Sequence, residues 1–410
     1  MNRVAAVGVL LSVFILFLYR GLYHSNLLFA IVITTVFEIA LISFNGYEID
    51  KCVQQVLLIS IFVLSYEQVF RSASSHIDSL FFKFIRLSYY ICLFGLLQEI
   101  VYIVNHINIS DYLIGIHLNQ PLFGSFIRIT STLSEGGYLG TILVPSLIYL
   151  FYYNDPHRIL GNKKYLILFV ALFTVSPFVY FSLFAIFSLR IYKRFKPIKY
   201  VVLAILVIVS TIGFTRLRNI ETEREAGGIE GIFMRFNDSL DMFEMLSNDR
   251  GYELTQYNVS TATLGTGLYI GINAPSRLLG TGLGTQEQNH NLIAGKILSG
   301  TEAFASLNKE DGYSLLTRIL TEWGFLGIII YIIFISFFFN KKNIINICVL
   351  CVLLCFFLRG GSYVDWGTVY WHFLYFYTSK HKVNAIDLNY KRLINKVKKN
   401  ERYIYYNRNL

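Results

Sequence analysis

Long apolar runs occupy most of this 410-residue chain, and one long polar stretch, about residues 216–313, interrupts them. Hydrophobic residues make up 54% of the sequence and charged residues only 15%, a balance that exceeds what the core of a water-soluble protein needs. Apolar runs of about 20 residues are long enough to cross a bilayer as helices. The pattern therefore predicts an all-α protein: a polytopic membrane helical bundle with one large loop outside the membrane.

The apolar runs predict about eleven spans, within a range of about 10 to 12. Single spans are expected near residues 4–19, 27–45, 52–70, 84–104, 138–153, 199–215, 314–338, 343–358 and 364–378. The run 165–189 has Ser176-Pro177 at its midpoint and basic residues at both ends. Two short antiparallel helices meeting at Ser-Pro would bring both basic ends to one side. The chain thus divides into N-terminal helices (1–215), the loop (216–313), C-terminal helices (314–378) and a basic tail (379–410).

Basic residues predict how the bundle is oriented, because Lys and Arg in short loops are retained in the cytoplasm. Residues 380–410 carry nine Lys/Arg against Asp387 and Glu401, a net charge of +7 out of the chain's +10. The basic loops 154–164 and 190–198 and the pair Lys341-Lys342 fall on the same side. The polar loop, which has eight Lys/Arg and thirteen Asp/Glu, then lies outside. The basic charge is therefore explained by topology and by attraction to anionic lipid, without nucleic acid.

The cysteines favour neither a disulfide framework nor a metal site. All five lie within or beside apolar runs, and none lies in the polar loop: Cys52, Cys92, Cys348, Cys351 and Cys355. Cys351 and Cys355 share a helix face, but no His or acid lies near them in the run. We therefore expect packing roles and no metal.

Arg318 and Glu322 are ionisable residues within a predicted span, where a charge costs at least ~2.5 kcal/mol and marks a candidate functional site. Their spacing of four residues places them on one face of the helix 314–338. One interpretation is an ion pair that fixes the register of the helix. The other is that Arg318, near the end of the span, presents its planar five-donor group to a phosphate.

A second polar cluster, GSFIRITSTLSEGG, lies just before the span 138–153 and on the same side as the loop. A capped helix start, with Ser134 as the cap and Glu135 complementing the dipole, accounts for Glu135 but leaves Arg128 unexplained. Both residues are therefore candidates for the functional site. Arg359, at the outer end of the run 343–358, has no assigned role.

A third cluster, SRLLGTGLGTQEQNHNL, closes the polar loop. Gly280, Gly282 and Gly284 lack the following Lys-Ser/Thr and the βαβ context of a nucleotide site. They are expected to let the backbone approach a ligand or a helix closely. Arg277 and His290 flank them, and His290 is either an ordinary loop histidine or a catalytic one.

The order of these motifs resembles that of the O-antigen polymerase family and, more loosely, that of the O-antigen ligases. The matching elements are Arg128 to Glu135, the FTVSPF hairpin, the large loop, LLGTGLG, and the helix running from Tyr313 to Gly327 (YSLLTRILTEWGFLG). The His290-Asn291 pair resembles a His-Asn pair of the ligases. The resemblance implies an architecture like that of GT-C type membrane glycosyltransferases.

The resemblance also implies an activity: joining oligosaccharide repeat units carried on undecaprenyl pyrophosphate, at the outer face of a bacterial inner membrane. Arg318 and Arg128 would bind the leaving pyrophosphate, helped by Arg277 or Arg216, with Glu322 and Tyr313 in support. Glu135 or His290 would accept the proton of the attacking hydroxyl. No metal or other cofactor is expected. The expected partners are lipid-linked donor and acceptor, membrane lipid and a chain-length regulator protein.

Other classes of protein fit parts of the sequence. An O-antigen ligase would share most of these motifs. A flippase or other transporter would explain Glu38 and Glu67 within early spans, but transporters usually show paired halves and short loops. Arg216, which directly follows a span, is equally explained as an interfacial anchor. A membrane scaffold would need all of these charges only for structure.

Overall fold

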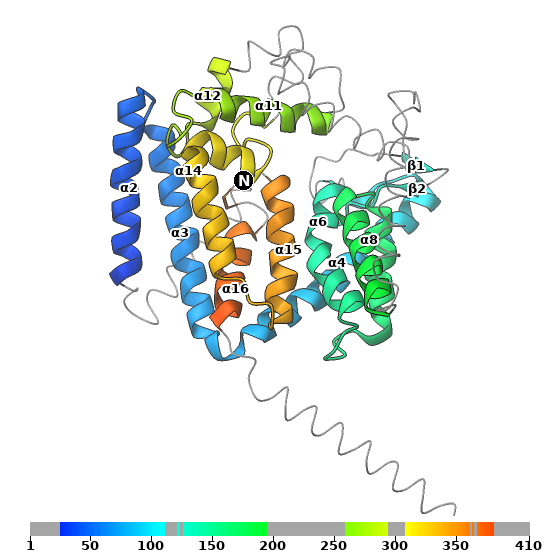
Figure 1. The fold of residues 1–410 in the computed structure, drawn as a ribbon. Coiled ribbons are helices and arrows are strands. Elements are labelled where there is room, and N and C mark those ends of the chain that lie inside the picture. The colour runs from blue at the N-terminus through cyan, green and yellow to red at the C-terminus, as the bar shows by residue number, and fades with distance from the viewer. Residues whose placement is uncertain are drawn as a thin grey trace, which may run out of the picture.

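The protein is predominantly helical in a computed structural model that describes residues 25–110, 121–123, 126–133, 135–194, 259–293, 308–360, 363–364 and 367–380 (Figure 1). The predicted spans 4–19 and 199–215, Arg216, Ser134, much of the polar loop and the tail beyond Lys380 lie outside the described residues.

Helices occupy the predicted apolar runs along the described chain, and two further helices, α11 and α12, lie within the predicted polar loop. They are α2 (Ser25–Asn45), α3 (Asp50–Ser72), α4 (Ile77–Asn105), α6 (Gly136–Leu147), α7 (Lys164–Phe173), α8 (Pro177–Arg194), α11 (Val259–Asn273), α12 (Gln286–Ile293), α14 (Leu315–Phe337), α15 (Ile344–Leu358) and α16 (Thr368–Lys380). Of these, α3, α4 and α14 are long and apolar enough to cross a membrane. Four shorter apolar helical segments accompany them: Phe29–Asn45, Gly136–Tyr152, Pro177–Arg190 and Ile344–Leu358.

Short irregular elements complete the described fold. A π-helical turn, η2 (Ile148–Tyr152), continues α6, and 3-10 turns η1 (Ser74–His76) and η3 (Gly161–Lys163) precede α4 and α7. Strands β1 (Pro121–Phe123) and β2 (Phe126–Ile127) form a small antiparallel ribbon, a minor departure from an all-α fold.

The run 165–189 forms two helices, as its Ser-Pro midpoint predicts. α7 ends at Phe173 and α8 begins at Pro177. The turn between them is held by local bonds, including one from Thr174 Oγ1 to the Ala171 carbonyl. Ser176 packs so closely on α6 that Gly140 has no room for a side chain.

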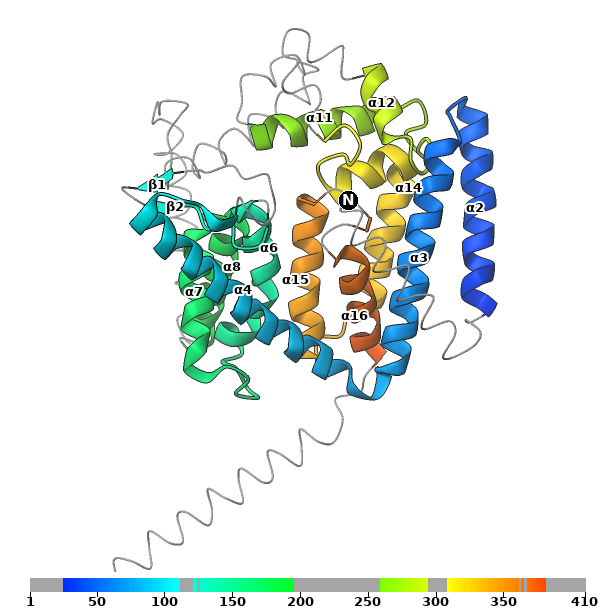
Figure 2. The ribbon, with the colours of Figure 1, turned by 180° about the vertical axis from the view of Figure 1, so that it is seen from behind.

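The bundle has two different ends (Figures 1 and 2). Helices α11 and α12 lie across one end, at the start of α14 and beside the end of α15. The α3–α4, η2–α7 and α14–α15 connections lie at the opposite end. That opposite end, called the basic end below, carries Arg71, Arg158, Lys163, Lys164, Lys341 and Lys342. α16 also ends there, since Asn340 Nδ2 donates to the Ser379 carbonyl.

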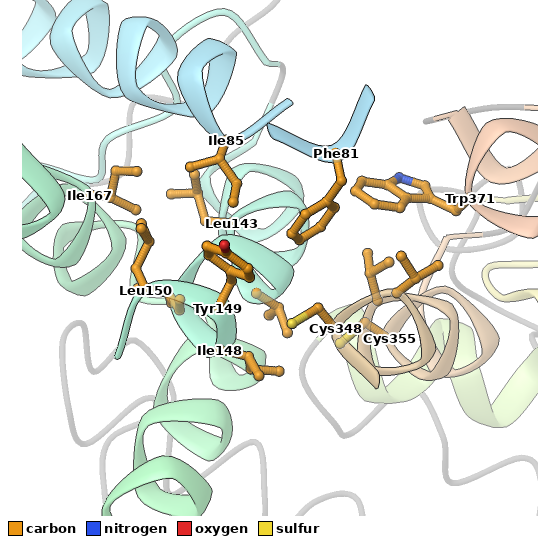
Figure 3. Close-up of a cluster of buried hydrophobic side chains, with 14 of the residues drawn as sticks. Phe81, Ile85, Leu143, Ile148, Tyr149, Leu150, Ile167, Cys348, Cys355 and Trp371 are labelled. Atoms are coloured by element: carbon orange, nitrogen blue, oxygen red, sulfur yellow. The ribbon is translucent and has the colours of Figure 1, made fainter. Parts of the chain in front are cut away.

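Side-chain packing joins α4, α6, α15 and α16 into one core (Figure 3). Phe81 meets Tyr149 edge to face at 5.5 Å between ring centroids, and Cys348, Cys355 and Trp371 pack in the same cluster. Other large apolar side chains point outward. Phe37 on α2, Leu97 on α4 and Ile333 on α14 are 51%, 49% and 59% exposed. In lipid such surfaces are favourable, and close packing rather than exclusion of water holds helices together.

Candidate active site

Arg318 and Glu322 form the predicted pair within the first turns of α14. The helix begins at Ser314, whose hydroxyl accepts a bond from the Thr317 amide in a capping box. Arg318 Nε lies 3.4 Å from the Glu322 carboxylate, and both side chains are buried. The guanidinium stands over the Tyr363 ring at 4.7 Å. Its other N–H groups make no hydrogen bond within the part of the chain that the structure describes.

The helix α14 is interrupted at Gly324, and the segment 277–284 fills the interruption. Gly324 has φ 62° and ψ −162°, which breaks the helical bonding. The Phe325 and Leu326 amides donate to the Arg277 and Leu278 carbonyls at 2.9 and 3.0 Å. The carbonyls of Thr321 and Glu322 accept bonds from the amides of Thr281 and Gly282. The broken helix is therefore satisfied by a second backbone, as apolar surroundings require.

The three glycines of this segment allow that close approach, as the sequence predicts. A side chain at Gly280 would collide with the Glu322 backbone, and one at Gly282 would collide with Ile42. A Cβ at Gly284 would lie 2.9 Å from the Cys52 backbone nitrogen. The glycines thus allow the backbone of segment 277–284 to lie directly against α14, α2 and α3.

Two buried carboxylates hold consecutive amides of the same segment. Glu38 Oε2 accepts a bond from the Leu283 amide at 2.7 Å, and Glu322 Oε1 accepts one from the Gly284 amide at 3.0 Å. Their side chains are on α2 and α14, so these bonds tie the loop to both helices. Glu322 therefore has two partners, Arg318 and the loop.

Arg359 and Glu135 form a second ion pair, between α15 and α6. Arg359 Nη2 donates to Glu135 Oε2 at 2.9 Å, and its guanidinium stands 5.5 Å from the Tyr138 ring centre. Gly137 makes room for it, because a Cβ there would lie 2.8 to 2.9 Å from the guanidinium. Gly360, the next residue, donates its amide to the Tyr313 carbonyl at 3.1 Å. Arg359 thus lies on a backbone paired with the residues that start α14.

Arg128 lies at the start of α6, where a Cβ at Gly136 would come within 2.9 Å of its Nε. Its Nε donates to the Thr174 carbonyl at 2.5 Å and its Nη2 to the Val175 carbonyl at 3.3 Å. These carbonyls lie in the turn after α7, where a cation satisfies the open end of a helix. The structure also brings Arg359, which the sequence left without a role, to the residues that start α14. In the sequence, Arg359 stands out as a charge at the end of an apolar run, directly before Gly360.

Arg277 and Tyr313 contact their neighbours in this region through their backbones. The Arg277 side chain is exposed, and only its backbone carbonyl joins the α14 break. Tyr313 is half-buried, has φ 66°, and pairs with Gly360 through its carbonyl. Arg216 lies outside the described residues.

His290 is buried on α12, with 5% of its surface exposed, and its Nε2 has no hydrogen-bond partner among the described residues. Burial lowers the pKa of this imidazole, and the nearby Lys309 ammonium lowers it further, while Glu287 opposes them. The ring is therefore neutral at pH 7 and has a nitrogen available to accept a proton.

An apolar cavity of about 520 Å³ lies among α2, α3, α14 and α16. Its walls include Ile31 on α2, Ile59 on α3, Leu315 and Ile319 on α14, Phe373 on α16, and Tyr363. Leu315 and Ile319 flank Arg318 along α14, and Tyr363 is the ring beneath its guanidinium. A buried cation thus adjoins a space suited to hydrocarbon.

No family model, curated protein or solved structure matches this chain. The chemistry of the site is therefore argued from its geometry. The start of α14 collects two guanidinium groups, Arg318 and Arg359, each paired with one carboxylate. Glu135 is one possible proton acceptor, and His290 on the overlying α12 is another.

Proposed function

We propose that the protein is a membrane glycosyltransferase that polymerises oligosaccharide repeat units carried on undecaprenyl pyrophosphate. The observation that carries the proposal is the buried Arg318 guanidinium beside an apolar cavity of about 520 Å³. A polyprenyl pyrophosphate has the matching parts, since its hydrocarbon chain suits the cavity and its phosphates suit the N–H groups that Arg318 leaves unused.

The chemistry assigned to the site is a single displacement. A hydroxyl oxygen of the acceptor sugar forms a bond to the anomeric carbon of the donor, while the bond from that carbon to the pyrophosphate oxygen breaks. The lipid pyrophosphate leaves with the electron pair, and Arg318 stabilises the growing negative charge. Arg359 supplies a further cationic group, in addition to Arg128, to which the resemblance assigns this role.

The hydroxyl proton passes to Glu135 or to His290. The lowered pKa of His290 keeps it unprotonated at neutral pH, which is what a general base requires. Glu135 is 34% exposed and already accepts a bond from Arg359. That exposure leaves its second carboxylate oxygen open to substrate.

The proposed setting is a bacterial inner membrane crossed by about eleven helices, with an architecture of the GT-C type. The gathering of Lys and Arg at the basic end supports placing that end in the cytoplasm. The end covered by α11 and α12 then faces outward, where the polar loop would cover the site. Lipid-linked donor and acceptor would both enter there. A chain-length regulator remains a prediction of the resemblance.

The decisive experiment displays the cell's surface polysaccharide on a gel. Arg318→Ala and Arg359→Ala are expected to leave single repeat units attached to the lipid A core, whereas Arg71→Ala, an exposed arginine at the basic end, keeps the normal ladder. A ligase defect would leave no repeat units attached. If the protein were a flippase, Glu38 and Glu67 would take part in its function. A flippase defect would strand precursor inside the cell. Normal ladders from both arginine variants, at unchanged expression, would contradict the proposed function.

A further inference from the structure

One buried face of α12 carries polar atoms that bind nothing within the described residues. Gln286 and His290 are four residues apart and therefore share that face. Gln286 is 1% exposed, and both its Oε1 and its Nε2 lack a hydrogen-bond partner in the part of the chain that the structure describes. His290 Nε2 lacks one as well.

Other side chains of the same helix are bonded to their surroundings. Asn289 Nδ2 donates to Thr281 Oγ1 at 2.8 Å and to the Thr285 carbonyl at 3.0 Å, while Asn289 Oδ1 accepts from the Tyr47 hydroxyl at 2.7 Å. Glu287 pairs with Lys51 at 2.8 Å and with Lys309 at 3.4 Å. The helix is thus anchored on several sides, so the unpaired atoms do not result from a poorly held segment.

An unpaired buried amide is unfavourable, and such groups in native proteins generally have a purpose. A leucine would fill the position of Gln286 without that cost. Gly312 lies against the Gln286 side chain. An added Cβ at Gly312 would lie 3.1 Å from Gln286 Cδ and 3.3 Å from its Nε2. Gly312 has φ 73° and lies two residues before the cap of α14. The amide therefore faces a glycine wall near the turn that carries Arg318.

We propose that the Gln286–His290 face binds a neutral, hydroxyl-rich sugar ring of the lipid-linked oligosaccharide. A carboxamide offers one donor and one acceptor side by side, which matches two neighbouring sugar hydroxyls. A phosphate would instead require cations, as at Arg318. This assignment rests on the proposed function and adds a sugar subsite separate from the pyrophosphate subsite.

The test measures the binding of two ligands to the purified full-length protein in lipid nanodiscs. One probe is the oligosaccharide repeat unit released by mild acid from the polysaccharide of the producing cells, and the other is undecaprenyl pyrophosphate. Gln286→Leu is expected to weaken repeat-unit binding about tenfold or more, because a site built for hydroxyl groups loses both of its hydrogen bonds. It leaves undecaprenyl pyrophosphate binding unchanged and raises the midpoint of thermal unfolding.

Two further variants complete the design. Gln286→Asn, which keeps the amide but withdraws it by one methylene, should fold normally and also weaken repeat-unit binding. Leu292→Ala, at an exposed position of α12, should match the wild type. Unchanged repeat-unit binding in Gln286→Leu and Gln286→Asn, or no binding of the repeat unit by the wild type, overturns the sugar subsite. Failure of the wild type to bind undecaprenyl pyrophosphate overturns the proposed function instead, so the two failures are distinguishable.

Discussion

Several buried charges in the described part of this protein have partners placed to meet them. Arg318 is the clearest case, because its guanidinium is 5% exposed and its carboxylate partner, Glu322, is fully buried. Removing one member of such a pair leaves an uncompensated charge, whereas removing both does not. The same carboxylate also holds the Gly284 amide, so Glu322 affects the loop as well as the arginine.

We therefore predict that Glu322→Leu lowers the free energy of unfolding by about 3–5 kcal/mol. The double variant Arg318→Met with Glu322→Leu should lose less, because no unpaired guanidinium remains. Thermal unfolding in detergent shows which of the two variants, the single or the double, is more stable. A double variant less stable than the single one would contradict an energetic role for the pair.

His290 predicts a pH dependence of stability. Because its folded pKa lies below the ordinary value of about 6.5, the unfolded chain takes up the proton first as the pH falls. The contribution of neutral His290 is complete above about pH 6.5 and declines as the pH drops below it. His290→Phe should flatten the stability curve between about pH 7 and pH 5 relative to the wild type. The exposed His76→Gln is the control, and an equal flattening there would refute the assignment.

At the scale of elements, α14 and the segment 277–284 act as one unit. The helix is broken within the bundle, and the loop supplies both the donors and the acceptors that the break leaves open. Glycine is required in the loop because the two backbones are in contact. The predicted span is thus a composite of a helix and a loop that precedes it by about forty residues.

Gly280→Ala tests that unit against a matched control. Gly46 has φ 74° and Gly280 has φ 77°, so both substitutions carry a similar backbone strain of about 1–2 kcal/mol. A Cβ at Gly46 meets nothing within 4 Å, whereas one at Gly280 collides with the Glu322 backbone. Gly280→Ala should therefore lower the unfolding midpoint much more than Gly46→Ala does. Equal shifts would show that the close contact is absent in solution.

At the scale of the whole molecule, the two ends differ in charge and in covering. Glu310 is exposed in the turn before α14, near α12, and Lys342 is exposed at the basic end. If the basic end is cytoplasmic, the two positions lie on opposite sides of the membrane.

Cysteine labelling of intact cells checks this orientation. Glu310→Cys should react with a membrane-impermeant maleimide added outside, and Lys342→Cys should react only after the cells are opened. Four of the five native cysteines are buried, and Cys351 is half-buried, so the unmodified chain is the background control. The reverse pattern of labelling would invert the topology.

The sequence by itself determined the features that depend on neighbouring residues. Run length and composition predicted membrane-spanning helices, Ser176-Pro177 predicted the break between α7 and α8, and a spacing of four predicted the Arg318–Glu322 pair. Each follows from helix geometry, because residues this close along a chain meet whatever the rest of the protein does.

The tertiary structure decided which distant groups share the site. Arg359 reaches Glu135 across 224 positions of sequence, and Glu38 reaches the Leu283 amide across 245. Arg128, to which the resemblance gives a phosphate-binding role, binds the carbonyls of Thr174 and Val175 in the turn after α7. Such contacts depend on how helices pack against one another, and periodicity within one helix carries no information about which neighbour its polar face will meet.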